Sequence, residues 1–155
     1  MESCCTLKPA KVSAATACPE CHRVGRNVER ITLKALLRPA ALERRSAAEH
    51  RFCATASCDV VYFGEGEVFR RDDVLVAVFQ KEPEGGRTVC YCFGVTEDEI
   101  RREVEDSGRS ASAARIKALV QVESCACEVR NPQGSCCLGN VTAVAKSPEA
   151  VAASR

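Results

Sequence analysis

The sequence predicts an α+β protein in which a small β-rich N-terminal domain precedes a small helical domain. Three observations lead to this prediction. β-branched and aromatic residues gather in the middle of the chain, the segment 83–86 (Pro-Glu-Gly-Gly) interrupts them, and the apolar spacing beyond it is that of short amphipathic helices. Because 155 residues divide into two domains too small for large cores, we expect metal ions to stabilise them.

Residues 1–17 show no sustained apolar period and are predicted to be a flexible tail. Apolar residues from Ile31 to Leu37 predict a strand that runs into a short helical turn ending before Pro39, and 42–50 is predicted to be a second helical turn. Strands are expected at runs of β-branched and aromatic residues: Phe52, 60–63 and 74–79. Gly64 and Gly66 mark the turn that follows 60–63.

The helical part begins at a capping box formed by Thr96 and Glu99, and Gly108 ends this helix. Ser110 is predicted to cap a second helix with an apolar face made of Ala113, Ile116, Leu119, Val120 and Val122. A cysteine-rich loop is expected over 125–139, followed by a short helix from about Cys137 to Ala145. The acidic residues of the first helix are expected to form a solvated surface: Glu97, Asp98, Glu99, Glu103 and Glu105.

Twelve cysteines are the main feature of the composition. No secretory signal is apparent and no apolar stretch has the length of a membrane span, so we expect a cytoplasmic protein with no membrane insertion. In a reducing cytosol, closely spaced cysteines indicate metal sites rather than disulfides. A net charge of +1 with interspersed acids and bases gives no reason to expect nucleic acid as a partner.

The N-terminal cysteines have the spacing of a structural zinc site. Cys18 and Cys21 form a CxxC knuckle, and Cys53 and Cys58 supply a second pair after a segment long enough to fold back. Four thiolates close a tetrahedron around Zn²⁺ and leave no open position for water, so this zinc would be structural. Two alternatives remain open: a site in which His22 replaces one cysteine, and four buried free thiols with no metal.

The C-terminal half contains a second group of cysteines. In Cys90-Tyr91-Cys92 a single residue separates two thiols, which suits two ligands on one iron of a [2Fe–2S] cluster as well as it suits zinc. The loop beyond offers four candidates for the two remaining ligands: Cys125, Cys127, Cys136 and Cys137. Turn amides in such a loop point N–H groups at sulfur and stabilise its charge.

Four segments in order carry a family resemblance: CPEC, RFCATASCDVVYF, VCYC with FGVTEDEI, and C-x₃-NPQGSCCLG. In this order they resemble the iron–sulfur and zinc domain of CopZ-type copper chaperones, over about Cys18 to Gly139. The second half is also similar to bacterioferritin-associated ferredoxins. The resemblance implies that the [2Fe–2S] ligands are Cys90, Cys92, Cys127 and Cys137, that the zinc ligands are Cys18, Cys21, Cys53 and Cys58, and that Cys125 and Cys136 are spare.

The linker at 83–86 and the composition of both ends predict the domain layout. A flexible tail with a cysteine pair is expected at 1–17, a zinc-binding domain at 18–83, a cluster-binding domain at 84–146 and a tail at 147–155. In the best-known family members a copper-carrying domain with its own CxxC follows, and this sequence shows no such motif after Gly139. Cys4 and Cys5 could instead capture a soft ion such as Cu(I), or could be an incidental pair.

Two functions fit these sequence features, and a zinc-stabilised interaction module is a third class. The first is a metallochaperone in copper or other soft-metal handling, with the cluster as electron donor and a metal transporter or redox protein as partner. The second is a ferredoxin-like electron-transfer or iron–sulfur carrier protein without metal cargo. No hydrolytic triad and no phosphate-binding glycine loop is evident, so the only enzymatic activity we expect is metal-ion reduction through the cluster.

Overall fold

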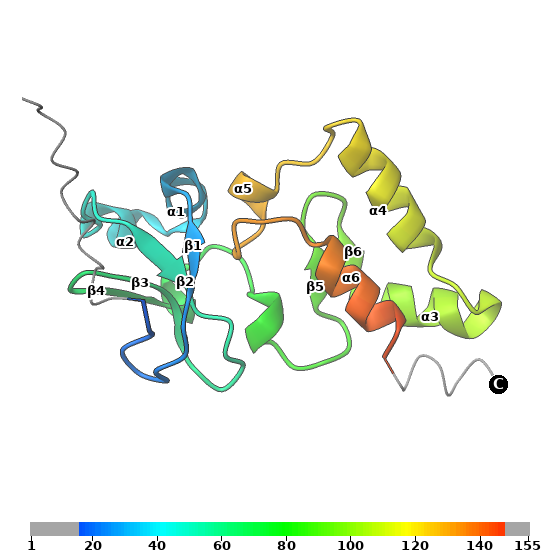
Figure 1. Ribbon diagram of the computed structural model, residues 1–155, viewed down its shortest axis with the longest axis horizontal. Coiled ribbons are helices and arrows are strands. Elements are labelled where there is room, and N and C mark those ends of the chain that lie inside the picture. Colours follow the sequence, from blue (N-terminus) through cyan, green and yellow to red (C-terminus); the bar gives the residue numbers. More distant parts are fainter. Residues whose placement is uncertain (1–15, 148–155) are drawn as a thin grey trace, which may run out of the picture.

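A computed structural model describes residues 16–147 and confirms the α+β architecture (Figure 1). The strands are β1 (Arg26–Val28), β2 (His50–Phe52), β3 (Val60–Gly64), β4 (Glu67–Arg70), β5 (Thr88–Cys90) and β6 (Val95–Thr96). The α-helices are α1 (Arg30–Leu36), α2 (Pro39–Glu43), α3 (Glu97–Ser107), α4 (Ala111–Gln121), α5 (Cys127–Arg130) and α6 (Leu138–Ala145). Two 3₁₀ helices are η1 (Arg71–Asp73) and η2 (Phe79–Lys81).

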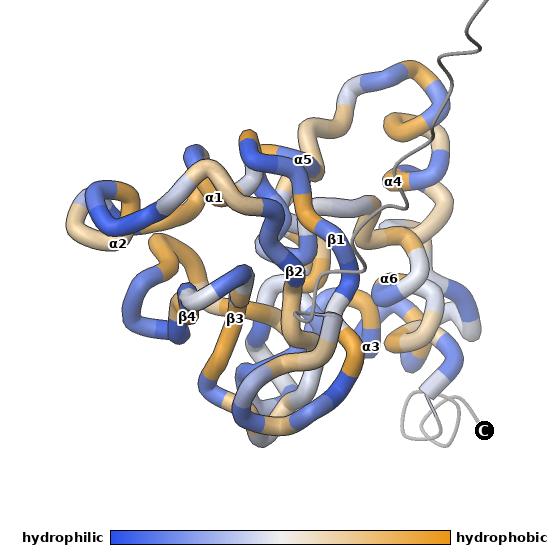
Figure 2. Tube along the Cα trace, turned by 60° about the vertical axis from the view of Figure 1, so that its left-hand side comes forward, coloured by the Kyte–Doolittle hydropathy of each residue, from blue (hydrophilic) through white to orange (hydrophobic). Residues whose placement is uncertain are grey.

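The first half is an antiparallel sheet in the order β1-β2-β3-β4 with α1 and α2 beside it. Its central strand β3 carries the hydrophobic colouring in Figure 2, and Tyr62 and Phe63 are almost fully buried there. Leu33, Leu36 and Phe69 belong to the same core as Tyr62, whereas Phe63 packs with Cys18, Cys53 and Cys58. The predicted turn between 60–63 and the next strand is confirmed, because Gly66 joins β3 to β4 with a φ of +74° that favours glycine.

The second half combines the two-stranded ribbon β5-β6 with α3, α4 and α6. Both predicted helix starts are confirmed, since the Thr96 hydroxyl accepts a hydrogen bond from Glu99 N–H and the Ser110 hydroxyl accepts one from Ala113 N–H. Gly108 ends α3 in the left-handed region, with a φ of 75°. The shared core consists of residues from each of these elements: Val89, Cys90, Val95, Ile100, Ile116, Cys137, Val141 and Val144.

Two predicted elements are wrong. The expected helical turn over 42–50 is instead the end of α2, an irregular loop and the start of β2, because Ser46 hydrogen-bonds Glu67 through its backbone N–H and its hydroxyl. The expected strand over 74–79 is extended, but only Val74 forms a bridge, to Leu37, and the run ends in η2. Val74 and Val78 are buried in the core of the first half, with Val78 only 1% exposed, whereas Leu75 between them is 50% exposed.

Other differences concern short elements. The apolar segment that begins at Ile31 is helical throughout as α1, and Pro39 starts α2 at a position that needs no N–H donor. The strands β4, β5 and β6 and the single-turn helix α5 were not expected, since each has only two to four residues. Val122, predicted on the apolar face of α4, is 69% exposed beyond the end of that helix.

The two halves lie side by side, and α5 packs against α1 between them (Figure 1). The cysteine-rich loop therefore lies next to the first half as well as the second. Between residues 16 and 147, no helix has the length and apolar character needed to cross a membrane.

Candidate metal centres

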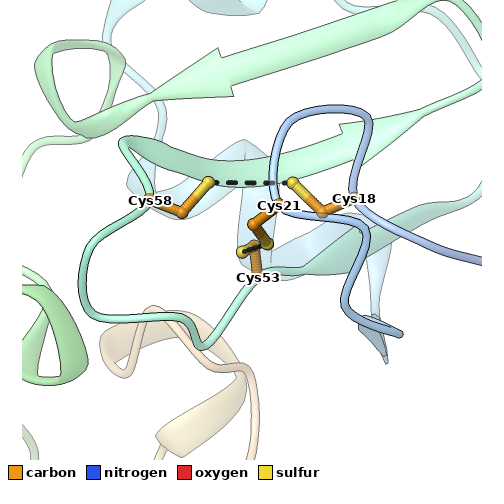
Figure 3. A group of neighbouring side chains, drawn as sticks. All are labelled: Cys18, Cys21, Cys53 and Cys58. Atoms are coloured by element: carbon orange, nitrogen blue, oxygen red, sulfur yellow. Dashed lines mark hydrogen bonds between the residues drawn. The ribbon is translucent and has the colours of Figure 1, made fainter.

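The four N-terminal cysteines point at one another (Figure 3). Their sulfurs all lie within 4.8 Å of one another, with 3.8 Å between Cys18 Sγ and Cys58 Sγ and 3.6 Å between Cys21 Sγ and Cys53 Sγ. Four sulfurs at about 2.3 Å from one tetrahedral zinc are about 3.8 Å apart. The thiols therefore have the spacing of a Zn²⁺ ligand set in which all four positions are taken.

Local backbone structure brings these cysteines together. Cys18 and Cys21 lie in a turn in which His22 N–H donates to Cys18 O and Cys18 N–H donates to Arg23 O. Cys53 directly follows β2, and Cys58 N–H donates to Thr55 O just before β3. His22, the alternative ligand, is exposed, and the compact sulfur group does not include it.

The thiols of this group differ in acidity. A hydrogen bond between Cys21 Sγ and Thr55 Oγ1, 3.3 Å long, is the main cause that lowers the pKa of Cys21 to about 6. Burial raises the pKa of Cys58 to about 12 and also raises that of Cys53. Cys21 is thus a thiolate at neutral pH, while a metal ion must displace the protons of Cys53 and Cys58.

A buried lysine lies beside the sulfurs. Lys81 is only 5% exposed, and its ammonium donates to Thr55 O and Cys58 O, each at 2.8 Å. Burial lowers its pKa, and the neighbouring thiolates act in the opposite direction. No sequence signal predicts this role, because Lys81 follows an apolar run and precedes a polar segment like an ordinary surface residue.

The second set of predicted ligands forms two pairs of sulfurs. Cys92 Sγ and Cys127 Sγ are 3.7 Å apart, the spacing of two ligands on one tetrahedral metal. Cys90 and Cys137 also hydrogen-bond, which lowers the pKa of Cys90 to about 6 and raises that of Cys137. Burial raises the pKa of Cys127 to about 12.

The sulfurs of Cys90 and Cys92 have different neighbours, although the single residue between them suits two ligands on one iron. β5 ends at Cys90, and the turn that follows, with Gly94 at a φ of 66°, leads Cys92 toward Cys127. The Ala126 N–H donates to Cys92 Sγ at 3.2 Å, as a turn amide beside a charged sulfur would. Cys90 remains in the core next to Cys137.

The spare thiols lie outside the two pairs. Cys125 is half-buried, and Cys136 is exposed with its sulfur accepting from Leu138 N–H at 3.5 Å. Cys4 and Cys5 lie outside the described residues. Tyr91, between Cys90 and Cys92, donates from its hydroxyl to Ala77 O at 2.6 Å and accepts from Phe79 N–H at 2.9 Å.

Comparison with known proteins bears on these sites. A family model described as a zinc-binding domain of CopZ type matches residues 15–75, which include all four N-terminal cysteines. The structure superimposes on the crystal structure of the CopZ N-terminal domain of Archaeoglobus fulgidus with a TM-score of 0.69 and 32% identity, covering 81% of this chain and 95% of that one. This chain belongs to the family of CopZ N-terminal domains.

A curated relative gives the extent of the similarity. Copper chaperone CopZ of Archaeoglobus fulgidus is 36% identical over 120 residues, which are 77% of this chain and 57% of the relative. The chain thus spans little more than half the length of that protein. Within this CopZ-type chain, the N-terminal part is a zinc-binding domain, and the compact sulfur group lies within it.

Proposed function

We propose that this protein is a metallochaperone-like protein of copper or other soft-metal handling that holds one structural zinc and one [2Fe–2S] cluster. The observation that carries the proposal is the presence of two separate four-cysteine sets on a CopZ-type fold. Zinc is assigned to the compact set because its sulfurs fit a closed tetrahedron. The cytosol is the proposed compartment, since all ten described cysteines are free.

The second set fits a two-iron group better than a single ion. Its four thiols are divided into the Cys92–Cys127 pair and the Cys90–Cys137 pair, and each pair can ligate one iron. Cys127 is 6% exposed and Cys90 and Cys137 are more buried still, which keeps water from most of the ligand set. When bound, a [2Fe–2S] cluster exchanges one electron, which is the chemistry that converts Cu(II) into Cu(I).

Metal and sulfide analysis of protein purified without oxygen tests the proposal. We expect two irons, two inorganic sulfides and one zinc per chain, because eight cysteines form two sets of four thiolates. Visible absorbance must accompany the iron. Two zincs and no sulfide, in protein from iron-replete cells, would contradict the cluster assignment and favour a zinc-stabilised interaction module.

Electron transfer or cluster delivery without a metal cargo is the second candidate. It is favoured by the extent of the similarity, because the structural match is to the N-terminal domain of the copper chaperone and the chain spans 57% of the curated relative. Copper stoichiometry separates the two functions. Binding of one Cu(I) per chain that is lost in a Cys4→Ala, Cys5→Ala variant would support the chaperone, whereas a filled cluster with no Cu(I) bound would support the carrier.

A further inference from the structure

The short helix η2 lies where the chain passes from one half to the other. Its Lys81 hydrogen-bonds the loop between Cys53 and β3, which we call the zinc loop. The ammonium bonds the carbonyls of Thr55 and Cys58, which lie near the two ends of the loop between Cys53 and β3. The ion pairs found within residues 16–147 do not include Lys81, and the four cysteines are the groups whose charge, once they are deprotonated, favours its ammonium form. A zinc bound by four thiolates carries a net charge of −2, which a buried ammonium partly balances.

The preceding residue of η2 reaches the other site. Gln80 Nε2 donates to Gln133 Oε1 at 2.7 Å. Gln133 is buried, and its own amide group donates to Ser135 O at 3.3 Å and to Cys136 O at 2.9 Å. Gln133 thus holds the turn that leads into Cys137. Gln80 orients Gln133 from the first half, and Asn140 Nδ2 donates to the same oxygen at 3.0 Å from within the second half.

Further contacts join the same loop to the first half. The buried Tyr62 hydroxyl, on the central strand β3, donates to Pro132 O at 2.6 Å. Gly134 packs so closely on α1 that a Cβ there would lie 3.1 Å from Thr32 Oγ1. The loop between α5 and α6 belongs to the second half but is therefore held in place by residues of the first half.

We propose that η2 couples the two metal sites, with Lys81 as a positioning residue of the zinc loop and Gln80 as a positioning residue of the loop that carries Cys137. Filling the zinc site fixes the carbonyls that Lys81 binds, and this fixes η2 and, through Gln80, the 131–137 loop. Retention of the second cofactor then depends on zinc. The proposal builds on the assignment of a [2Fe–2S] cluster to the second half, but the coupling itself concerns only residues of this chain.

The first experiment uses full-length protein loaded with zinc but free of iron, and measures amide hydrogen exchange. Protected amides of the 131–137 loop report its order, because Gly134 N–H donates to Asn131 O and Gln133 N–H donates to Asn131 Oδ1. We expect removal of zinc with a chelator to speed exchange in this loop. Unchanged exchange after zinc removal would overturn the coupling, whatever the cluster content of the native protein.

Two variants separate the steps of the link. Lys81→Met keeps a long side chain but loses the charge and both hydrogen bonds, so we expect zinc affinity to fall about 10- to 100-fold and loop exchange to rise. Gln80→Leu should leave zinc affinity unchanged and still speed exchange in the loop about fivefold, the factor that corresponds to one hydrogen bond. Lys117→Met, on the exposed face of α4, is the matched control and should change neither quantity.

The second experiment uses protein that contains iron, and follows loss of visible circular dichroism in the presence of a ferrous chelator. Gln80→Leu should lose the signal about fivefold faster than wild type while retaining its zinc. If Lys81→Met does not fold, Gln80→Leu and zinc removal still test the coupling. A Gln80→Leu protein that loses its cluster at the wild-type rate would overturn it, whereas protein that never contains iron but shows zinc-dependent exchange would overturn the cluster assignment alone.

Discussion

Each set of four cysteines contains one acidic thiol beside neighbours that resist ionisation. In the N-terminal set, Cys21 has a pKa of about 6, while burial raises the pKa of Cys58. In the second set, Cys90 has a pKa of about 6, while the hydrogen bond between Cys137 and Cys90 raises the pKa of Cys137. Binding of the proposed metal to each set would therefore start from an available thiolate and release the protons of Cys58 and Cys137. The two sites differ in shape, since one set is compact and the other forms two pairs.

At the residue scale, the cysteines of the 125–137 loop are predicted to differ in function. Cys127→Ala and Cys137→Ala should each lose most of the visible absorbance during aerobic purification, because losing one thiolate exposes an iron to water. Cys125→Ala and Cys136→Ala should retain it, because neither sulfur belongs to the two pairs. Absorbance spectra of the four variants, normalised to protein, are the measurement.

Ligand exchange is the main complication in this comparison. The exposed Cys136 interacts electrostatically with both Cys127 and Cys137, so it could replace either one. A shifted spectrum in Cys137→Ala calls for the Cys136→Ala, Cys137→Ala double variant, which should be colourless. An unshifted spectrum in Cys127→Ala together with loss in Cys125→Ala would mean that the ligand assignment in this loop is wrong.

At the scale of elements, the sequence pattern of α3 predicted the helix correctly, but it wrongly placed Glu97 on the solvent-exposed face. Glu97 was expected on a solvated acidic face, yet it is 1% exposed. Its carboxylate accepts from Arg87 Nε at 2.6 Å, from Arg101 at 2.7 Å and from Gly85 N–H at 2.9 Å. The predicted linker 83–86 is thus held against the first turn of α3.

Glu97→Gln is predicted to destabilise the second half by about 3 kcal/mol, because it removes the charge from a buried pair and leaves the guanidinium groups poorly compensated. Burial alone would raise the pKa of Glu97, but hydrogen bonds from Arg87 and Gly85 and the charges of Arg87 and Arg101 lower it. A lowered pKa means that this stabilisation is complete above about pH 4.3, the pKa of an unfolded Glu, and disappears as the pH falls through the folded value.

Urea unfolding at pH 7 and at several lower pH values checks this prediction. The difference between wild type and Glu97→Gln should be largest at pH 7 and should shrink below about pH 4.3. Glu105→Gln, an exposed position on the same helix, is the control and should stay within about 0.5 kcal/mol of wild type. Equal stability of the two variants at pH 7 would contradict the structural role of Glu97.

The sequence predicted those elements that have local signals. Thr96, Gly108 and Ser110 act through hydrogen bonds and φ angles within their own helix ends, so their roles could be inferred without tertiary structure. The 74–79 run was predicted incorrectly because its buried Val74 and Val78, in the core of the first half, alternate with exposed residues as they would in a strand. The zinc ligands were brought together as expected, whereas the pairing of Cys92 with Cys127 depends on a turn that cysteine spacing does not specify.

At the scale of the whole molecule, the halves are connected by specific polar contacts as well as by the chain. Besides the bonds of Tyr62 and Gln80, Arg26 on β1 donates to Ser135 Oγ at 3.2 Å. All three contacts end on the loop between α5 and α6, which lies between the two predicted ligands Cys127 and Cys137. The predicted boundary near residue 83 therefore separates two parts of the chain that remain connected, because the first half hydrogen-bonds the loop between Cys127 and Cys137.

Tyr62→Phe tests this connection with the smallest possible change. The ring stays in the core of the first half, while the buried Pro132 carbonyl loses its donor, at a cost of about 1–3 kcal/mol. We expect amide exchange to rise in the 131–137 loop and little change around the zinc knuckle, measured on the zinc-loaded chain. Tyr91→Phe is the matched control, because the Tyr91 hydroxyl bonds Ala77 O and Phe79 N–H in the connecting segment and should leave the loop less affected. If Tyr62→Phe destabilises only the first half and leaves exchange in the loop unchanged, the hydroxyl does not hold the loop, and Gln80 and Arg26 must account for its position.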